Sequence, residues 1–177
     1  MKSRQEQATS TRQAVDTATR KSIDAVIKQF FKDDTTTLLL ESFAEAFLVI
    51  NEKSTVMLVN RRFTELFGYE KDEIVGQRLN QIIPERFRSA HSEHTRNYFK
   101  SPHVRSMGQG LELKGLKKDG TEFPIEVSIS FLQNDKEKLG MAFITDITAR
   151  AEAEQALQKQ NRALSDFSQT VAHDLKS

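Results

Sequence analysis

The sequence predicts an α+β fold, in which a five-stranded antiparallel sheet carries helices on one face and is flanked by a helix at each end. Two short apolar runs separated by a polar turn open the middle of the chain, and segments with helical spacing follow them. Beyond residue 110 the apolar period changes from helical to two, across the strong hairpin signal Asp119-Gly120. Along the chain, two strands are followed by several short helices and then by three strands. The five strands therefore form one sheet, and the helices cover one of its faces.

The composition limits the classes of function. The 177 residues include 26 Lys and Arg against 25 Asp and Glu, so the charge gives no reason to expect a nucleic-acid partner. The absence of cysteine excludes disulfides, thiolate metal sites, a cysteine nucleophile and a flavin–cysteinyl adduct. A non-covalent flavin or a small metabolite stays open as a ligand. No apolar run reaches the length of a membrane span, so we expect a soluble, cytoplasmic chain.

Residues 1–37 form the first of three expected segments, an amphipathic helix and linker. The segment contains no Gly or Pro that would break a helix. Its apolar residues recur at roughly helical spacing, namely Val15, Ala18, Ile23, Val26, Ile27 and Phe30. Residues 1–12 lack this spacing, and for them we expect a flexible tail without regular secondary structure.

Residues 38–148 form the expected central domain. The runs "AFLVIN" and "TVMLVN" predict a hairpin, and "RRFTELFGY" predicts a helix that ends at Gly68. Pro84 is placed as the first residue of a longer helix running to about Phe99. The hairpin across Asp119-Gly120 leads into a strand with one buried and one wetter face, and "LGMAFIT" is the last strand. The residues expected on the buried face are Phe123, Ile125, Val127, Ile129 and Phe131.

Residues 149–177 form the third segment, a helix with the seam of a coiled coil. The seam residues follow a four-three-four-three-four spacing: Leu157, Asn161, Leu164, Ser168, Val171 and Leu175. Because the seam is narrow and its flanks are polar, we expect pairing with a second copy rather than one helix lying on its own domain. Asn161 costs stability in such a seam but fixes register and parallel pairing.

These segments resemble a PAS sensor domain that feeds a histidine kinase. "LLLESFAEAFLVIN" and "TVMLVNRRFTELFGYEKDEIVGQ" resemble the first half of a PAS domain, "KKDGTEFPIEVSIS" its central hairpin, and "FITDIT" the motif that starts the output helix. The resemblance implies the PAS fold for residues 38–148. Asp146 or Thr148 is then a candidate N-cap that fixes how the output helix leaves the sheet, and Asn161 a candidate switching residue.

The closing "VAHDLKS" resembles the H-box of histidine kinases. The resemblance implies that His173 is the phosphate acceptor and that Asp174 is the neighbouring acid that assists proton transfer. In the predicted heptads His173 takes the outermost position, which suits an acceptor that must meet a nucleotide. No segment could cradle a nucleotide, so this chain is not expected to be an enzyme by itself. The implied partners are a second copy, through the coiled coil and PAS surfaces, and a response regulator through the complete kinase.

The helix after Pro84 carries a candidate ligand site. Its residues Phe87, His91, His94 and Tyr98 are expected to share one face that looks at the sheet. One interpretation is that the histidines are ordinary core or rim residues. A second is haem with His91 as axial ligand, because "RSAHSEHTRNYF" is similar to the local pattern of haem-binding PAS proteins. A third is a metal held by His91 and His94.

The distal side departs from the haem proteins. Where the oxygen sensors of that family place a stabilising arginine, this chain has Leu111, and where a relative uses a methionine ligand it has Gln109. These differences weaken oxygen sensing more than haem binding. There are three rival classes. One is a ligand-free dimerisation module, and another is a transcriptional regulator, for which no helix-turn-helix or basic patch is found. The third is a hydrolase using His91 and His94, which lacks a convincing nucleophile or carboxylate partner.

Overall fold

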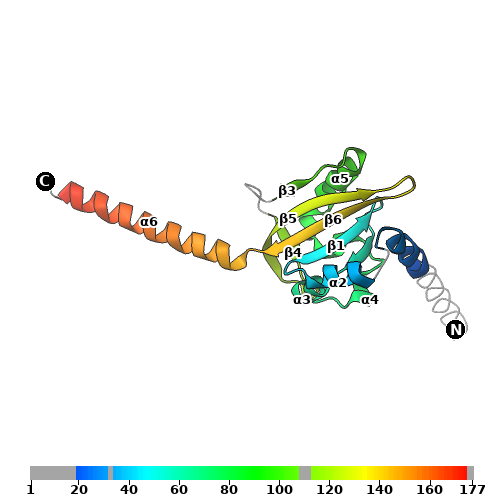
Figure 1. The fold of residues 1–177 in the computed structure, drawn as a ribbon. Helices are drawn as coiled ribbons and strands as arrows, with labels where there is room; N and C mark the ends of the chain where they lie inside the picture. The colour runs from blue at the N-terminus through cyan, green and yellow to red at the C-terminus, as the bar shows by residue number, and fades with distance from the viewer. Residues whose placement is uncertain (1–18, 32–33, 108–112, 175–177) are drawn as a thin grey trace, which may run out of the picture.

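The computed structural model describes residues 19–31, 34–107 and 113–174, with side chains described only as far as residue 164 at the C-terminal end. The centre of the fold is an antiparallel sheet with the strand order β2-β1-β6-β5-β3, and β4 also pairs with β5 (Figure 1). The strands are β1 (Ala46–Asn51), β2 (Val56–Val59), β3 (Arg105–Met107), β4 (Lys114–Leu116), β5 (Glu122–Gln133) and β6 (Lys138–Asp146).

The short strands β3 and β4 occupy one position beside β5. β3 pairs with residues 127–129 of β5, and β4 pairs with residues 122–124 of the same strand. The sheet therefore has five strand positions, which confirms the predicted fold class. Gly120 has a φ of 89°, a left-handed conformation that suits glycine, at the predicted turn between β4 and β5. Gln109 and Leu111 lie between β3 and β4, outside the described residues.

Four short helical elements form the inner layer: α3 (Arg61–Phe67), α4 (Lys71–Ile74), a 3₁₀ helix η1 (Leu79–Ile82) and α5 (Glu85–Lys100). The side chain of Asn60 caps α3 by accepting from the N–H of Phe63, and Gly68 ends the helix at a φ of 76°. Pro84 stands at the position just before α5. The core under this layer joins inward residues of the strands to the helices, including Leu48, Ile50, Phe63, Phe67, Phe99, Phe123 and Ile125.

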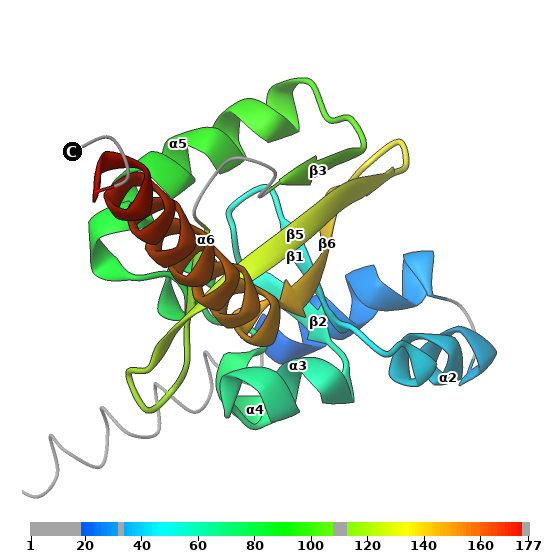
Figure 2. The ribbon, with the colours of Figure 1, turned by 90° about the vertical axis from the view of Figure 1, so that its left-hand side faces the viewer.

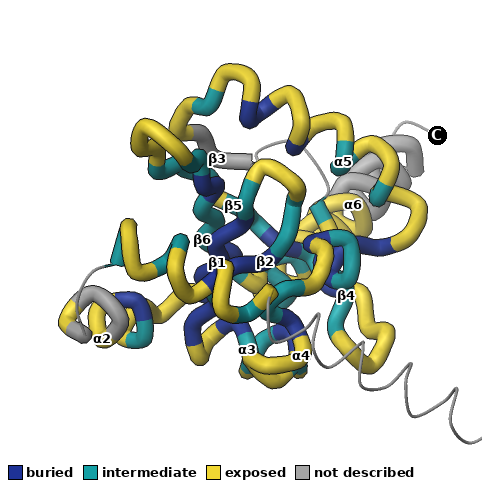
Figure 3. The backbone as a smooth tube through the Cα atoms, turned by 90° about the vertical axis from the view of Figure 1, so that its right-hand side faces the viewer, coloured by how far each residue is buried: buried dark blue, intermediate teal, exposed yellow. Residues whose placement is uncertain are grey.

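The predicted buried face of β5 is confirmed at one end of the strand. Phe123 and Ile125 are buried, whereas Val127, Ile129 and Phe131 are only partly buried. The strand is twelve residues long, and the inner helices cover the stretch nearest to β4. Figure 3 shows buried residues concentrated along β1, β2 and β6, with exposed backbone around them.

The opposite face of the sheet is also covered. A helix over residues 19–30, called here the N-terminal helix, packs with α2 (Asp34–Ser42) against outward residues of β1, β2 and β6. Ile23 and Leu40 are buried in this second cluster beside Phe47, Val49 and Leu139. Since β1 is buried on both faces, the expectation of helices on one face holds for the inner layer alone. The expected tail at residues 1–12 lies outside the described residues.

The helix α6 (Thr148–Asp174) leaves the end of β6 and extends away from the domain (Figures 1 and 2). Its 27 residues correspond to a length of about 40 Å. Residues 152–164 are all exposed, including Leu157 and Leu164. This part of α6 therefore has no contact with the domain that would bury its leucines, and the alternative of a helix lying on its own domain is wrong for these residues.

Candidate functional site

The face that α5 turns to the sheet differs from the predicted one. Thr95, Tyr98 and Phe99 are buried and His91 is partly buried, whereas His94 is exposed. Phe87 is 38% exposed. Because each residue turns an α-helix by about 100°, His94 lies about 90° from the direction midway between Tyr98 and Phe99, and Thr95 only about 10° from it. The expectation that His94 and Phe87 face the sheet is therefore wrong, and Thr95 takes the place expected of His94.

His91 has a specific polar neighbour. The hydroxyl oxygen of Thr95 lies 3.3 Å from Nδ1 of His91, and the same hydroxyl donates to the backbone carbonyl of His91 at 2.9 Å. Burial lowers the pKa of His91, and the nearby His94 lowers this pKa further. The imidazole is therefore favoured in its neutral form, which can accept a hydrogen bond or bind a metal through one ring nitrogen.

Aromatic rings gather around Tyr98, further along the same helix. Tyr98 is buried two turns further along α5, and its ring lies 6.0 Å from that of Phe99 and 6.1 Å from that of His103, measured between centroids. Leu111, the fourth residue of the predicted ligand site, lies outside the described residues. The described part of the chain contains no group of three or more His, Cys, Asp or Glu side chains placed to hold a metal ion.

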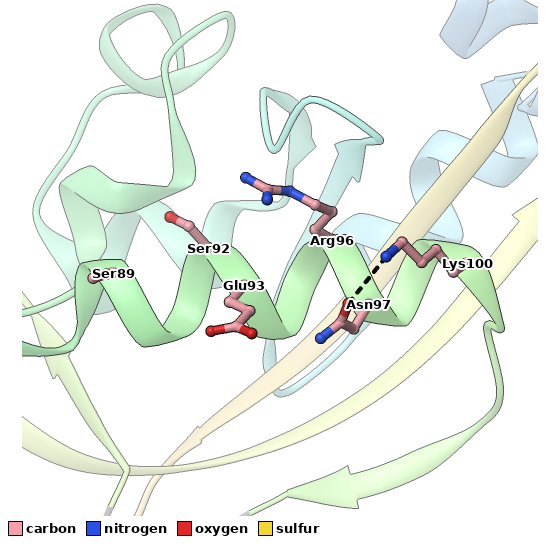
Figure 4. A pocket seen from close by; sticks show the side chains of 6 residues that line it. All are labelled: Ser89, Ser92, Glu93, Arg96, Asn97 and Lys100. Carbon is pink, nitrogen blue, oxygen red and sulfur yellow. Dashed lines mark hydrogen bonds between the residues drawn. The ribbon is translucent and has the colours of Figure 1, made fainter.

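A separate, open depression runs along the polar side of α5 (Figure 4). Within it Nζ of Lys100 donates to Oδ1 of Asn97 at 3.5 Å. Neither His91 nor Tyr98 lines this depression, so it is distinct from the predicted ligand site. Its lining consists of Ser89, Ser92, Glu93, Arg96, Asn97 and Lys100.

The start of α6 is fixed to the sheet by side chains from two strands. A carboxylate oxygen of Asp146 accepts from the backbone N–H of Thr148 at 2.8 Å, so Asp146 rather than Thr148 supplies the capping oxygen. Arg150 forms a two-pronged ion pair with Glu126 of β5, and its guanidinium lowers the pKa of Glu126. The N–H of Ile147 donates to the carbonyl of Pro124 at 3.1 Å. These contacts join β5 and the end of β6 to the first turn of α6.

The remaining predicted site residues lie along α6. Asn161 is exposed between Leu157 and Leu164. His173 and Asp174 belong to the last turn of the described helix, and their side chains lie outside the described residues. The far end of α6, to which residues 173 and 174 belong, extends away from the sheet (Figure 1).

Thr95, Glu126 and Arg150 were not singled out from the sequence. A threonine four residues after a histidine on a buried helical face is a local signal that could have indicated the first. The ion pair joins residues 24 positions apart, and only the strand register brings them together.

Residues 44–149 match the PAS domain family, and the chain belongs to this family. Over 148 residues it is 28% identical to "Sensor protein FixL" of Bradyrhizobium diazoefficiens, with 77% of this chain and 29% of that protein covered. Over 117 residues it is 30% identical to "Oxygen sensor protein DosP" of Escherichia coli, with 66% of this chain and 14% of that protein covered. The chain thus spans less than a third of each relative and resembles the PAS domains of sensor proteins.

The solved structures show the same fold. A crystal structure of a PAS domain from a two-component sensor histidine kinase superposes with a TM-score of 0.53 at 14% identity. The match covers 63% of this chain and 93% of that one. None of the described helices combines the length and apolar character that a membrane crossing requires.

Proposed function

We propose that this chain is the sensing and dimerising module of a histidine kinase, and that it relays a signal from the PAS core through paired α6 helices to His173. The observation that carries the proposal is the exposed stretch of α6. Leu157 and Leu164 are 59% and 65% exposed and seven residues apart, on a helix whose described bonds to the sheet lie at its base. Leucines repeating at seven-residue spacing on an unpacked helix are typical of one strand of a coiled coil.

Pairing places each functional residue in a consistent position. In the heptad that puts Leu157 and Leu164 in the seam, Asn161 also lies in the seam and His173 on the outer side. The outer position leaves the imidazole accessible to a nucleotide-binding domain, and Asp174 follows it as the assisting acid. α2 adds a PAS surface for the dimer, since its Leu38 and Leu39 are 69% and 57% exposed.

The oligomeric state of the chain tests the pairing. We expect a dimer by analytical ultracentrifugation, and a monomer when Leu157→Arg and Leu164→Arg are combined, because two charges in the seam oppose pairing. Lys159→Glu changes the charge at an outer heptad position of the same helix and should leave the dimer intact. A monomeric parent chain, or a dimer that survives the double substitution, would contradict pairing through α6.

The acceptor role of His173 is tested in the complete kinase to which we assign the chain. Labelling with radioactive ATP should disappear in His173→Gln and persist in His103→Gln, which changes an exposed histidine of the PAS domain. The label should be acid-labile and alkali-stable, as expected of phosphohistidine. Undiminished labelling of His173→Gln would place the acceptor elsewhere, and the chain would remain a PAS dimerisation module.

A second candidate function is haem-based sensing with His91 as axial ligand. It is favoured by the partly buried, neutral imidazole of His91 and by similarity to a protein named as an oxygen sensor. His91 fits the role of an axial ligand, because a neutral imidazole on a helix that faces an apolar core can bind iron. Haem would supply gas or redox chemistry there. Tyr98 and Phe99 would contribute apolar surface that excludes water.

Hemin titration of the purified chain tests this candidate. A saturable Soret band is expected, and it should be lost in His91→Ala while His94→Ala keeps it, since His94 is exposed. A flat spectrum in the parent chain would refute haem binding. Sensing would then rest on a different ligand or on a signal arriving through the N-terminal helix.

A further inference from the structure

The contact between Thr95 and His91 carries more information than a simple packing contact. The two residues are one helical turn apart, and Thr95 is only 8% exposed. Its hydroxyl donates to the carbonyl oxygen of His91 at 2.9 Å, a bond that faces back along the helix. The same oxygen atom lies 3.3 Å from Nδ1 of the imidazole. One threonine oxygen thus contacts both the backbone and the ring of His91.

The number of protons available decides which group donates in the contact between Thr95 and Nδ1 of His91. A hydroxyl has a single proton, and in its shorter contact, 2.9 Å to the carbonyl oxygen of His91, only the hydroxyl can donate, so this bond uses the proton. The hydroxyl can therefore offer only lone pairs to Nδ1. A hydrogen bond between them forms only when Nδ1 carries the ring proton, and a neutral imidazole has one proton to place.

We infer that Thr95 is a positioning residue that holds the proton of His91 on Nδ1 and leaves Nε2 as the unprotonated, electron-donating nitrogen. The nitrogen that binds a metal or accepts a hydrogen bond is set by the bond that the other nitrogen makes. The branched side chain of Thr95, restricted by its own helix, also fixes the plane of the ring. His94 has no such neighbour among the described hydrogen bonds and is exposed, so this arrangement distinguishes His91.

The inference deepens the second candidate function and rests on it where iron is concerned. A ligand imidazole that donates its other N–H becomes a stronger base, and loss of such a partner typically lowers metal affinity by about 10–100-fold. For hemin held by His91, Thr95 would therefore determine the strength of the bond and the orientation of the ring. The tautomer itself is a property of the metal-free chain and is measured without hemin.

The tautomer is tested by ¹⁵N NMR of the imidazole in the hemin-free chain, at a pH where His91 is neutral. The parent should show Nδ1 as the protonated nitrogen. Thr95→Val keeps the shape of the side chain but removes the hydroxyl, and it should give a mixture or the opposite tautomer. Thr95→Ser restores a hydroxyl and should return the parent pattern. Amide spectra check that each variant is folded.

Hemin provides the second readout. Thr95→Val should bind hemin about tenfold more weakly and lower the iron–histidine stretching frequency, and Thr95→Ser should recover both. Protonation of Nε2 in the parent, or an unchanged tautomer in Thr95→Val, would overturn the role of Thr95 even if hemin binds. Absence of hemin binding would refute the haem candidate alone, because the NMR result still decides whether Thr95 sets the tautomer.

Discussion

Asn60 connects three segments at the start of the domain. Its side-chain oxygen accepts from the N–H groups of Phe47 and Phe63 at 2.9 and 3.0 Å, and its amide nitrogen donates to the carbonyls of Leu40 and Glu45 at 3.2 and 3.0 Å. The residue is 1% exposed, and its bonds with Phe47, Leu40 and Phe63 are buried, whereas the bond to Glu45 is partly buried. One side chain thereby holds the end of α2, the start of β1 and the first turn of α3 together.

Asn60→Ala should lower the free energy of unfolding by about 2–4 kcal/mol, because it removes the side-chain bonds with Phe47, Leu40, Glu45 and Phe63, of which only the bond to Glu45 is not fully buried. The measurement is urea unfolding followed by circular dichroism. Asn51→Ala is the matched control: Asn51 accepts from the N–H groups of Lys53 and Thr55 in the β1–β2 turn, where water can replace it. Its cost should be about 1 kcal/mol. Equal losses in the two variants would contradict the structural role of Asn60.

For single residues, the sequence indicated which side chains could act as ligands, but it was less informative about which side chains face the sheet. It indicated His91 as a candidate ligand, but a four-three-four spacing fits more than one face of a helix. Because Phe99 is buried together with Tyr98, the buried face of α5 includes Thr95 rather than His94. Which side of the helix is buried depends on how α5 packs against the sheet. Gly140 of β6 would bring an added Cβ within 3.2 Å of Phe99, so this close approach of sheet and helix is a tertiary property.

The connection between sheet and output helix is the main feature at the scale of elements. Asp146 at the end of β6 caps α6, and Arg150 in its first turn reaches Glu126 on the neighbouring strand. The ion pair is partly exposed, so it contributes little stability and acts chiefly on direction. The two contacts together define the angle at which α6 leaves the sheet.

Asp146→Ala should loosen the first turn of α6 and leave the sheet unchanged. Loss of a capping side chain costs about 1 kcal/mol, which corresponds to roughly fivefold faster opening of the turn. Hydrogen exchange of the amides at the start of α6 measures it, with the amides of β5 as an internal reference. Asp146→Asn retains a capping oxygen and should behave almost as the parent. Equal exchange in Asp146→Ala and the parent would show that the cap does not hold this turn.

Most elements could be predicted because their signals are local. The β1–β2 hairpin, the end of α3 at Gly68 and the turn at Gly120 each depend on a few adjacent residues. The cover over the second face of the sheet could not be assigned in this way. Apolar spacing predicted the N-terminal helix. The place where this helix packs depends on contacts between distant residues, such as that between Arg20 and Asp72, which lie 52 positions apart.

At the scale of the whole molecule, the contrast between the packed PAS domain and the exposed α6 determines how a signal could travel. The domain is packed on both faces of β1, whereas Leu157 and Leu164 of α6 are exposed. Heptad spacing predicts a seam for a second helix, and this pairing stays a prediction. The spacing does not indicate which chain supplies the second helix.

We propose that the α6 pair, kept in one register by Asn161, has two rotational arrangements of similar energy. A polar residue in the seam holds the pair below its maximal stability, so a few kcal/mol of differential interaction from the PAS core suffices to change the populations. Asn161→Leu should tighten the dimer by about 2 kcal/mol or more, because two leucines become buried where two amides were. It should also leave a single arrangement populated.

Spin labels test this directly, because the chain contains no cysteine and a label on Lys159→Cys is unique in each copy. The parent dimer should give two distance populations across the α6 pair, and the same label combined with Asn161→Leu should give one. Gln155→Leu adds an equally large apolar side chain at an outer heptad position and should preserve both populations. If the parent shows a single distance, or if Asn161→Leu keeps two, then Asn161 does not set the balance and switching must originate at the base of α6, where Glu126 and Arg150 meet.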